Sequence, residues 1–185
     1  MNLRDNYDTR EHLMGILKAE IIKDDGSAET LFEDKNQIVV DSGYLIRQFL
    51  VNDENTKGIK YIAFGDMNLT EKDDTKNIRP ATCNDYKLDN EVFRKEVTYD
   101  LIEDDYGYGV VFSVILEKDE CNGSTGEQLI TEYALLSESI YGNTAPEEKQ
   151  GKNIMFSRKT RAAIYKDYEM KLKFSWTIYF KKVCE

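Results

Sequence analysis

Histidine and cysteine are both scarce in this chain of 185 residues. The single histidine, His12, lies in a charged stretch, so a catalytic triad or a histidine-rich metal site would lack its principal residue. Cys83, Cys121 and Cys184 are far apart and form no Cys-x-x-Cys pair, which predicts neither a disulfide framework nor a zinc site. We therefore expect no cofactor and no metal, and we interpret the three thiols as incidental.

Long apolar runs and an excess of positive charge are also missing. No segment approaches the roughly 18–20 apolar residues of a membrane helix, and the polar lead at 1–12 lacks the apolar core of a signal peptide. The 35 acidic residues outnumber the 25 basic ones, and the net charge of −10 repels nucleic-acid phosphates. With 41% hydrophobic residues, the composition predicts one folded domain over 1–185, made in the cytoplasm, with neither a membrane nor a nucleic acid as partner.

Alternation of apolar and polar residues is the strongest pattern that is present. In "EMKLKFSWTIYFKK" (169–182), every second residue is apolar, and the only tryptophan, Trp176, lies on the apolar side. Because side chains of a strand alternate between faces, this stretch predicts a long half-buried strand with Trp176 in the core.

Shorter segments with the same alternation run through most of the chain. Hairpins are predicted in 13–40 around "DDGS" and in 90–120 around "EDDYGYG", and further extended segments at 59–66, 127–142 and 154–160. The fold class is therefore predicted to be mainly β, a β-sandwich or barrel-like, with one α-helix in the N-terminal half.

The predicted helix covers 41–52, with Asp41 or Ser42 as its N-cap. Its expected apolar face consists of Tyr44, Leu45, Ile46, Phe49 and Leu50.

Two long polar segments, 67–87 and 143–153, show no periodicity and each contain one of the two prolines. Loops of this length in a compact domain are usually functional, so we expect docking loops that become ordered on assembly. The residues expected at such an interface are Asp73, Arg79, Tyr86 and Tyr141, and several of the twelve tyrosines lie in loops, as is typical of protein-binding or glycan-binding surfaces.

Glu132 is the one acidic residue embedded in an apolar run, between "LIT" and "YALL". A glycosidase needs a carboxyl group whose pKa is raised in such a setting, together with a second acid. The alternative interpretation is structural: on a strand, Glu132 points outward or pairs with a basic residue such as Arg94. We prefer the structural interpretation because no second acid lies in a comparably apolar setting.

Four stretches in order, "IAFGD" (62–66), "LDNEVFRKEV" (88–97), "ITEYALLSES" (130–139) and "IMFSRKTRAAIYKDYEMKLKFSWTIYF" (154–180), resemble a pattern of tailed-bacteriophage virion proteins. The pattern belongs to tail-collar, tail-fibre-anchoring and baseplate-like domains. The matching positions are Gly65, Asp66, Leu88, Glu91, Arg94, Ile130, Glu132, Leu135, Arg158, Lys166, Leu172, Phe174, Trp176, Ile178 and Phe180. Ala134 and Ser157 depart from it, since glycine and alanine are usual at those two places.

The resemblance implies a non-enzymatic virion structural protein, located in the tail, collar or baseplate, that forms a symmetric homo-oligomer and joins other virion proteins such as fibres. The alternative is a tail module that binds a host glycan or receptor. Two acid–base pairs, Glu91 with Arg94 and Glu132 with Arg158, are expected to lock the loops at one end of the sheet.

Overall fold

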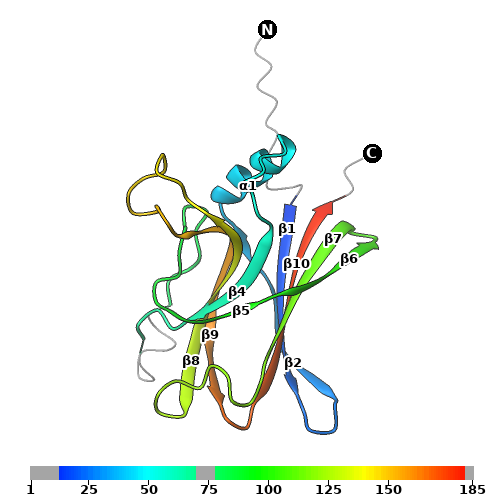
Figure 1. Ribbon diagram of the computed structural model, residues 1–185. Coiled ribbons are helices and arrows are strands. Elements are labelled where there is room, and N and C mark those ends of the chain that lie inside the picture. Colours follow the sequence, from blue (N-terminus) through cyan, green and yellow to red (C-terminus); the bar gives the residue numbers. More distant parts are fainter. Residues whose placement is uncertain (1–12, 70–77, 182–185) are drawn as a thin grey trace.

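The computed structural model describes residues 13–69 and 78–181 and consists of two antiparallel five-stranded sheets with one helix in the described part (Figure 1). The first sheet has the order β2 (Ala28–Lys35), β1 (Leu13–Ile22), β10 (Lys171–Lys181), β7 (Gly107–Leu116) and β6 (Thr98–Asp104). The second sheet has the order β3 (Gln37–Ile38), β9 (Asn153–Asp167), β8 (Glu127–Ile140), β4 (Ile59–Gly65) and β5 (Glu91–Glu96). The predicted mainly β fold is confirmed, and it is sandwich-like rather than a closed barrel.

The central strand of the first sheet is β10, as the alternation in 169–182 predicts. It pairs with β1 on one side and β7 on the other. Leu172, Phe174 and Trp176 are completely buried, whereas Lys171 and Lys173 on the opposite face are partly exposed. The rings of Phe174 and Phe64 lie 4.8 Å apart between the two sheets, so β10 supplies the first sheet's half of the shared core.

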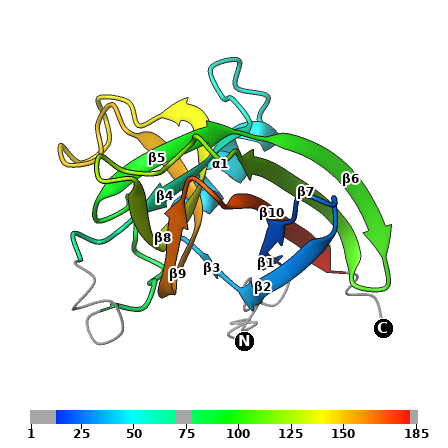
Figure 2. The same cartoon turned by 90° about the horizontal axis from the view of Figure 1, so that it is seen from below.

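The chain passes from one sheet to the other at both lateral edges. Asn36 separates β2 from β3, and Val97 separates β5 from β6 (Figure 2). The hairpin around 104–107 is confirmed between β6 and β7, but the alternating segment that precedes it is divided at Val97 into two strands, β5 in the second sheet and β6 in the first. Each sheet edge is therefore covalently continuous with an edge of the other sheet.

Asn36 links the two sheets by hydrogen bonds. In the amide orientation that satisfies both of its ends, Nδ2 donates to Ser157 Oγ at 2.5 Å, and Oδ1 accepts from Trp176 Nε1 at 2.6 Å. Oδ1 also accepts from the backbone N–H of Ile16 at 3.1 Å. A Cβ on Gly15 would lie 2.1 Å from the nearest atom of the Asn36 side-chain amide, so Gly15 leaves the space that this side chain occupies.

The helix α1 (Asp41–Leu50) lies at one end of the sandwich and starts at the predicted residue (Figure 1). Its N-cap is Val40, without a side-chain capping bond, so the prediction of Asp41 or Ser42 is wrong.

The predicted apolar face of α1 is also only partly correct. Leu45 is buried and Ile46 packs on the core, but Tyr44 and Phe49 are exposed and Leu50 is 82% exposed. At 3.6 residues per turn, these five residues spread around more than half of the helix, and only one side of α1 contacts the sheets.

One strand boundary also differs from the sequence prediction. The strand expected at 154–160 continues to Asp167, because Ile164–Asp167 pair with Glu127–Ile130 of β8. Backbone pairing with β8 thus extends β9 through a charged stretch at which the sequence suggested that the strand ends.

No helix among the described residues is long and apolar enough to span a bilayer.

Candidate functional site

Glu132, in the middle of β8, is completely buried and both of its carboxylate oxygens are hydrogen-bonded. Oε1 accepts from the backbone N–H groups of Met67 at 3.2 Å and Asn90 at 2.9 Å. Oε2 accepts from the Asp89 N–H at 2.9 Å and from Arg158 Nη2 at 2.5 Å. The carboxylate therefore fastens both ends of the long 66–90 segment to the second sheet.

Arg158, on the neighbouring strand β9, is the counter-ion of Glu132 and is also completely buried. Its guanidinium forms ion pairs with Asp85 at 3.1 Å and Asp89 at 3.0 Å, and it donates to the Lys87 carbonyl at 3.3 Å. Because Arg158 is the partner, the alternative pairing of Glu132 with Arg94 is wrong. The predicted pairing of Glu132 with Arg158 is present.

A second arginine, Arg79, closes the network from the solvent side. Its Nε and Nη2 donate to the two oxygens of Asp89, both at 2.8 Å, and Nη1 donates to Asp85. Burial acts to raise the pKa of Asp89, but the hydrogen bonds from Arg79 and Arg158 outweigh it, so the pKa is lowered. We call Arg79, Asp85, Asp89, Glu132 and Arg158 the loop lock.

The motif residues at the start of this segment surround the loop lock. A Cβ on Gly65 would lie 2.4 Å from the Asn90 carbonyl and 2.5 Å from Glu132 Oε1, so only glycine fits without displacing them. Asp66 accepts from the Asn90 side chain at 2.8 Å and from Gln128 at 3.3 Å. Leu88 is buried in a small apolar cluster of the second sheet. Residues from all four of the resembling stretches thus converge here although the stretches are far apart along the chain.

The other predicted acid–base pair, Glu91 with Arg94, is also present but lies outside the loop lock. Arg94 Nη2 donates to Glu91 at 2.8 Å, and Nη1 donates to the Asn153 side chain at 2.7 Å. The pair joins β5 to the start of β9, and both residues are exposed.

Lys166 and Trp176 are buried elsewhere. Lys166 Nζ donates to Asn122 Oδ1 at 2.9 Å and to the Asp167 carbonyl at 2.8 Å, and burial lowers its pKa. Lys166 thereby fixes the loop between β7 and β8, and Trp176 fills the core and binds Asn36.

The residues predicted at docking loops have different environments. Asp73 lies outside the described residues, and Arg79 belongs to the loop lock. Tyr86 is partly buried, and Lys149 lies over both its ring and that of Tyr141, at 5.3 and 5.5 Å. The two predicted loops therefore contact each other.

Tyr141 is buried at 6% exposure, so its prediction as an interface residue is wrong. Its hydroxyl donates to Asp41 at the start of α1, and burial and the Asp41 carboxylate together raise its pKa. Lys149 pairs with the same carboxylate at 2.8 Å. The loop at 141–152 is thus fixed to the helix rather than held out for a partner.

Asp85, Asp89 and Asn36 are important residues that the sequence interpretation missed. Acidic and amide side chains in polar, aperiodic segments are normally predicted to be exposed to solvent. The one local signal of a structural role was the position of two aspartates close to the "L-x-x-E" motif. Among the described residues, no group of histidine, cysteine, aspartate and glutamate has the arrangement of a metal site.

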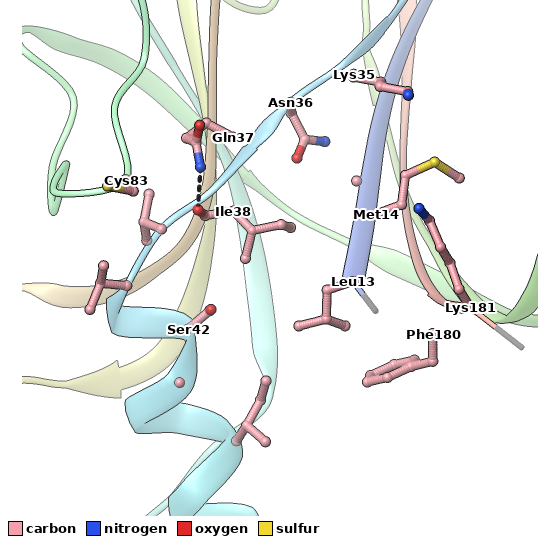
Figure 3. Close-up of a pocket in the computed structure, with 15 residues that line it drawn as sticks. Leu13, Met14, Lys35, Asn36, Gln37, Ile38, Ser42, Cys83, Phe180 and Lys181 are labelled. Carbon is pink, nitrogen blue, oxygen red and sulfur yellow. Dashed lines mark hydrogen bonds between the residues drawn. The ribbon is translucent and has the colours of Figure 1, made fainter. Parts of the chain in front are cut away.

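A cavity of about 870 Å³ lies between α1 and the nearby ends of β1 and β10 (Figure 3). Leu13 and Phe180 line it from the first sheet, and Ile38 and Ser42 line it from the opposite side. Its lining is mainly apolar.

Comparisons of this chain with family models, with curated proteins and with solved structures gave no match.

Proposed function

We propose that this protein is a non-enzymatic structural component of a tailed-bacteriophage virion, which forms a symmetric oligomer and joins other virion proteins. One observation carries the proposal. Gly65, Asp66, Leu88, Glu132 and Arg158 come from four separate stretches of the resembling pattern, and they meet around one buried network. A chance similarity of short motifs has no reason to converge in space.

The chemistry of the loop lock also favours a structural role over catalysis. A general acid must present its carboxyl group to a substrate, yet each oxygen of the buried Glu132 already accepts two hydrogen bonds from the protein, one of them from Arg158. A network in which the buried carboxylate and its arginine are hydrogen-bonded to the loop instead fixes one loop geometry. Repeated docking around a symmetry axis requires such a fixed surface.

The test is to look for the protein in assembled particles. Phage particles purified from the producing culture are analysed by mass spectrometry, and the recombinant protein is analysed by size-exclusion chromatography with light scattering. The expected results are tryptic peptides of this chain at stoichiometric abundance in the particles and an oligomer in solution. Absence from purified particles together with a strict monomer would overturn the proposal.

A variant comparison connects this test to the loop lock. Arg79→Ala opens the outer side of the network without creating a core cavity and should lower incorporation into particles. Lys23→Ala removes an exposed pair with Glu29 on the β1–β2 turn and serves as the control. Equal incorporation of both variants would show that the fixed loop does not take part in assembly.

A glycan- or receptor-binding tail module is the second candidate, and exposed tyrosines favour it. Tyr99, Tyr106 and Tyr108 on β6, β7 and their turn are all more than half exposed, and the Tyr106 ring packs 5.6 Å from that of Tyr179. Rigid aromatic surfaces of this kind bind sugar rings and protein partners alike. A glycan array gives hits that are lost in Tyr106→Ala if this candidate is correct, and a blank array excludes the glycan form.

A further inference from the structure

Lys166 is the one fully buried lysine among the described residues, and Asn122 is the one buried asparagine. The two side chains are bonded to each other, since Lys166 Nζ donates to Asn122 Oδ1 at 2.9 Å. A buried ammonium group is normally paired with a carboxylate. In the described part of the chain, the acceptors around Lys166 are instead this amide oxygen and the backbone carbonyls of Lys118 and Asp167.

The two residues meet at the end of the sandwich opposite α1 (Figure 1). Asn122 lies in the loop between β7 and β8, which passes from the first sheet to the second, and Lys166 is next to the last residue of β9. Alternation along β9 places Lys166 on the same face as Ile164, a residue of the hydrophobic core. The amine therefore lies on the inner side of the second sheet.

The Asn122 amide is held at both of its ends. Nδ2 donates to the Lys118 backbone carbonyl at 2.7 Å, and Oδ1 accepts from Lys166 Nζ. The reversed amide would place its NH2 group against the lysine amine, donor against donor, so these partners fix its orientation.

The lysine nitrogen is close to the amide carbon as well as to the oxygen. Because a C=O bond is about 1.2 Å long, Lys166 Nζ lies within about 4 Å of Asn122 Cγ. Two groups held in a fixed orientation at nearly reactive separation gain a large advantage over the same groups free in solution. The geometry therefore favours attack of this amine on this amide.

Burial also makes the amine more reactive. It lowers the pKa of Lys166, although Cys121, Asp167, Asp119 and Glu120 act in the opposite direction. A lower pKa increases the fraction of neutral amine, and only the neutral amine has the lone pair that a nucleophile needs.

We propose that Lys166 and Asn122 form an intramolecular isopeptide bond in the folded protein. Lys166 first gives one proton to solvent, and the neutral Nζ attacks Cγ of Asn122. The Nζ–Cγ bond forms, the Cγ–Nδ2 bond breaks, one proton moves from Nζ to Nδ2, and ammonia leaves. The step exchanges one amide for another, so it needs no oxidant or reductant. This inference goes beyond the proposed function and does not rest on it.

The cross-link would close a covalent ring between two residues that are 44 positions apart. The ring contains β8 and nearly all of β9, which pair with each other in the second sheet. Because a covalent link between distant residues limits the freedom of the unfolded chain, it should increase resistance to heat and to proteases.

Mass spectrometry of the denatured full-length protein tests the bond directly. The intact mass should be lower than the mass of the sequence by one ammonia molecule. Digestion with trypsin should give one species in which residues 119–149 are joined to residues 162–171, left uncut after Lys166 because the amide removes the lysine charge. A native chain with the full mass of its sequence would overturn the inference.

A second reaction of Asn122 also releases ammonia and must be distinguished. Gly123 follows Asn122, and the backbone nitrogen of such a glycine can close a succinimide ring on the asparagine side chain. The succinimide joins no second peptide and does not need Lys166. Loss of ammonia that persists in Lys166→Arg, without linked peptides, would therefore rule out the isopeptide bond.

Matched lysine variants identify the nucleophile. Lys166→Arg keeps a positive charge and hydrogen-bond donors, but its guanidinium stays protonated and cannot attack, so the variant should have the mass of its sequence. Asn122→Ala should behave in the same way. Lys118→Arg, in the same loop, is the control and should keep the linked peptides, because its side chain is exposed and pairs with Asp24. Loss of the linked peptides in Lys118→Arg as well would contradict the assignment to Lys166.

The test on the native chain does not depend on whether the variants fold, and it is separable from the test for virion assembly. A protein found in particles without linked peptides would sink this inference and leave the proposed function standing. Linked peptides in a protein absent from particles would support the isopeptide bond and count against the virion assignment.

Discussion

Arg158 Nη2 donates a 2.5 Å hydrogen bond to Glu132 Oε2, and neither side chain is exposed to solvent. The two residues are 26 positions apart in the chain and lie on adjacent strands. An ionised group without a partner in such a position costs several kcal/mol, so each residue can remain buried only because the other is present. Because this pair holds the 78–90 segment through Asp85, Asp89 and Asn90, the segment can take its position only when β8 and β9 are correctly paired.

Arg158→Met should lower the free energy of unfolding by about 3–5 kcal/mol, because it leaves Glu132 charged and buried without a counter-ion. Arg158→Lys keeps the charge but loses the two-pronged donor geometry, so its loss should be intermediate. Urea denaturation followed by tryptophan fluorescence measures both. The control Lys23→Met breaks an exposed ion pair with Glu29 and should leave the midpoint unchanged. A midpoint for Arg158→Met close to that of the control would contradict the role given to the pair.

Gly15→Ala should destabilise the fold, since the new Cβ would lie 2.1 Å from the nearest atom of the Asn36 amide and would displace the side chain that binds Trp176. A loss of about 1–3 kcal/mol is expected for the buried hydrogen bonds. Gly43→Ala is the matched control within α1, where a Cβ meets no atom within 4 Å. Because alanine favours a helix over glycine, that control should be stabilised by up to about 1 kcal/mol. Equal melting temperatures for the two variants would show that Asn36 is not fixed by this contact.

Acidification should weaken the loop lock through Asp89. Its pKa is lower in the folded protein than the value of about 3.9 for an unfolded aspartate. A carboxyl group of this kind contributes stability that is complete above the unfolded pKa and disappears as the pH falls through the folded pKa. The difference in unfolding free energy between the native chain and Asp89→Asn should therefore shrink below about pH 4. A difference that stays constant with pH would show that the charge of Asp89 contributes nothing.

Tyr141→Phe should loosen the loop at 141–152, because it removes the hydroxyl that donates to Asp41 while keeping the buried ring. Limited digestion with trypsin should then cut after Lys149 or Lys152 several times faster. Tyr168→Phe, at an exposed tyrosine of the β9–β10 turn, is the control and should leave the cleavage rate unchanged. Cleavage of Tyr141→Phe at the native rate would mean that other contacts hold the loop.

Period-2 alternation predicted the strands that pack on one face only. This holds for β1 and β10, along which buried and partly exposed residues alternate. The β6–β7 hairpin and β4 also lie where the pattern placed them, although β6 has no buried residue and residues 62–65 of β4 are buried on both faces. The pattern was less informative for β8 and β9. Residues 129–137 of β8 are buried on both faces, and their sequence reads as an apolar run that contains one acidic residue.

The loops and the helix were predicted less accurately, for a reason that their own residues illustrate. The sequence around Tyr141 looks like an exposed polar loop, and nothing local shows that Asp41, 100 positions away, accepts its hydroxyl. Leu50 fits an amphipathic helix, but α1 contacts the sandwich on one side only, and Leu50 remains exposed. Long-range contacts decide burial in such segments, and a local pattern cannot contain them.

The sequence by itself determined the mainly β class and the central strand around Trp176, because side-chain alternation follows directly from the geometry of an extended backbone. It also marked Glu132 as unusual, since an acidic residue inside an apolar run must be paired if it is buried. Only the tertiary structure decided that Arg158 is the partner, that Asn36 joins the two sheets and that Lys166 contacts Asn122. Each of these depends on which strands and loops are adjacent, and those relationships arise only when the whole chain has folded.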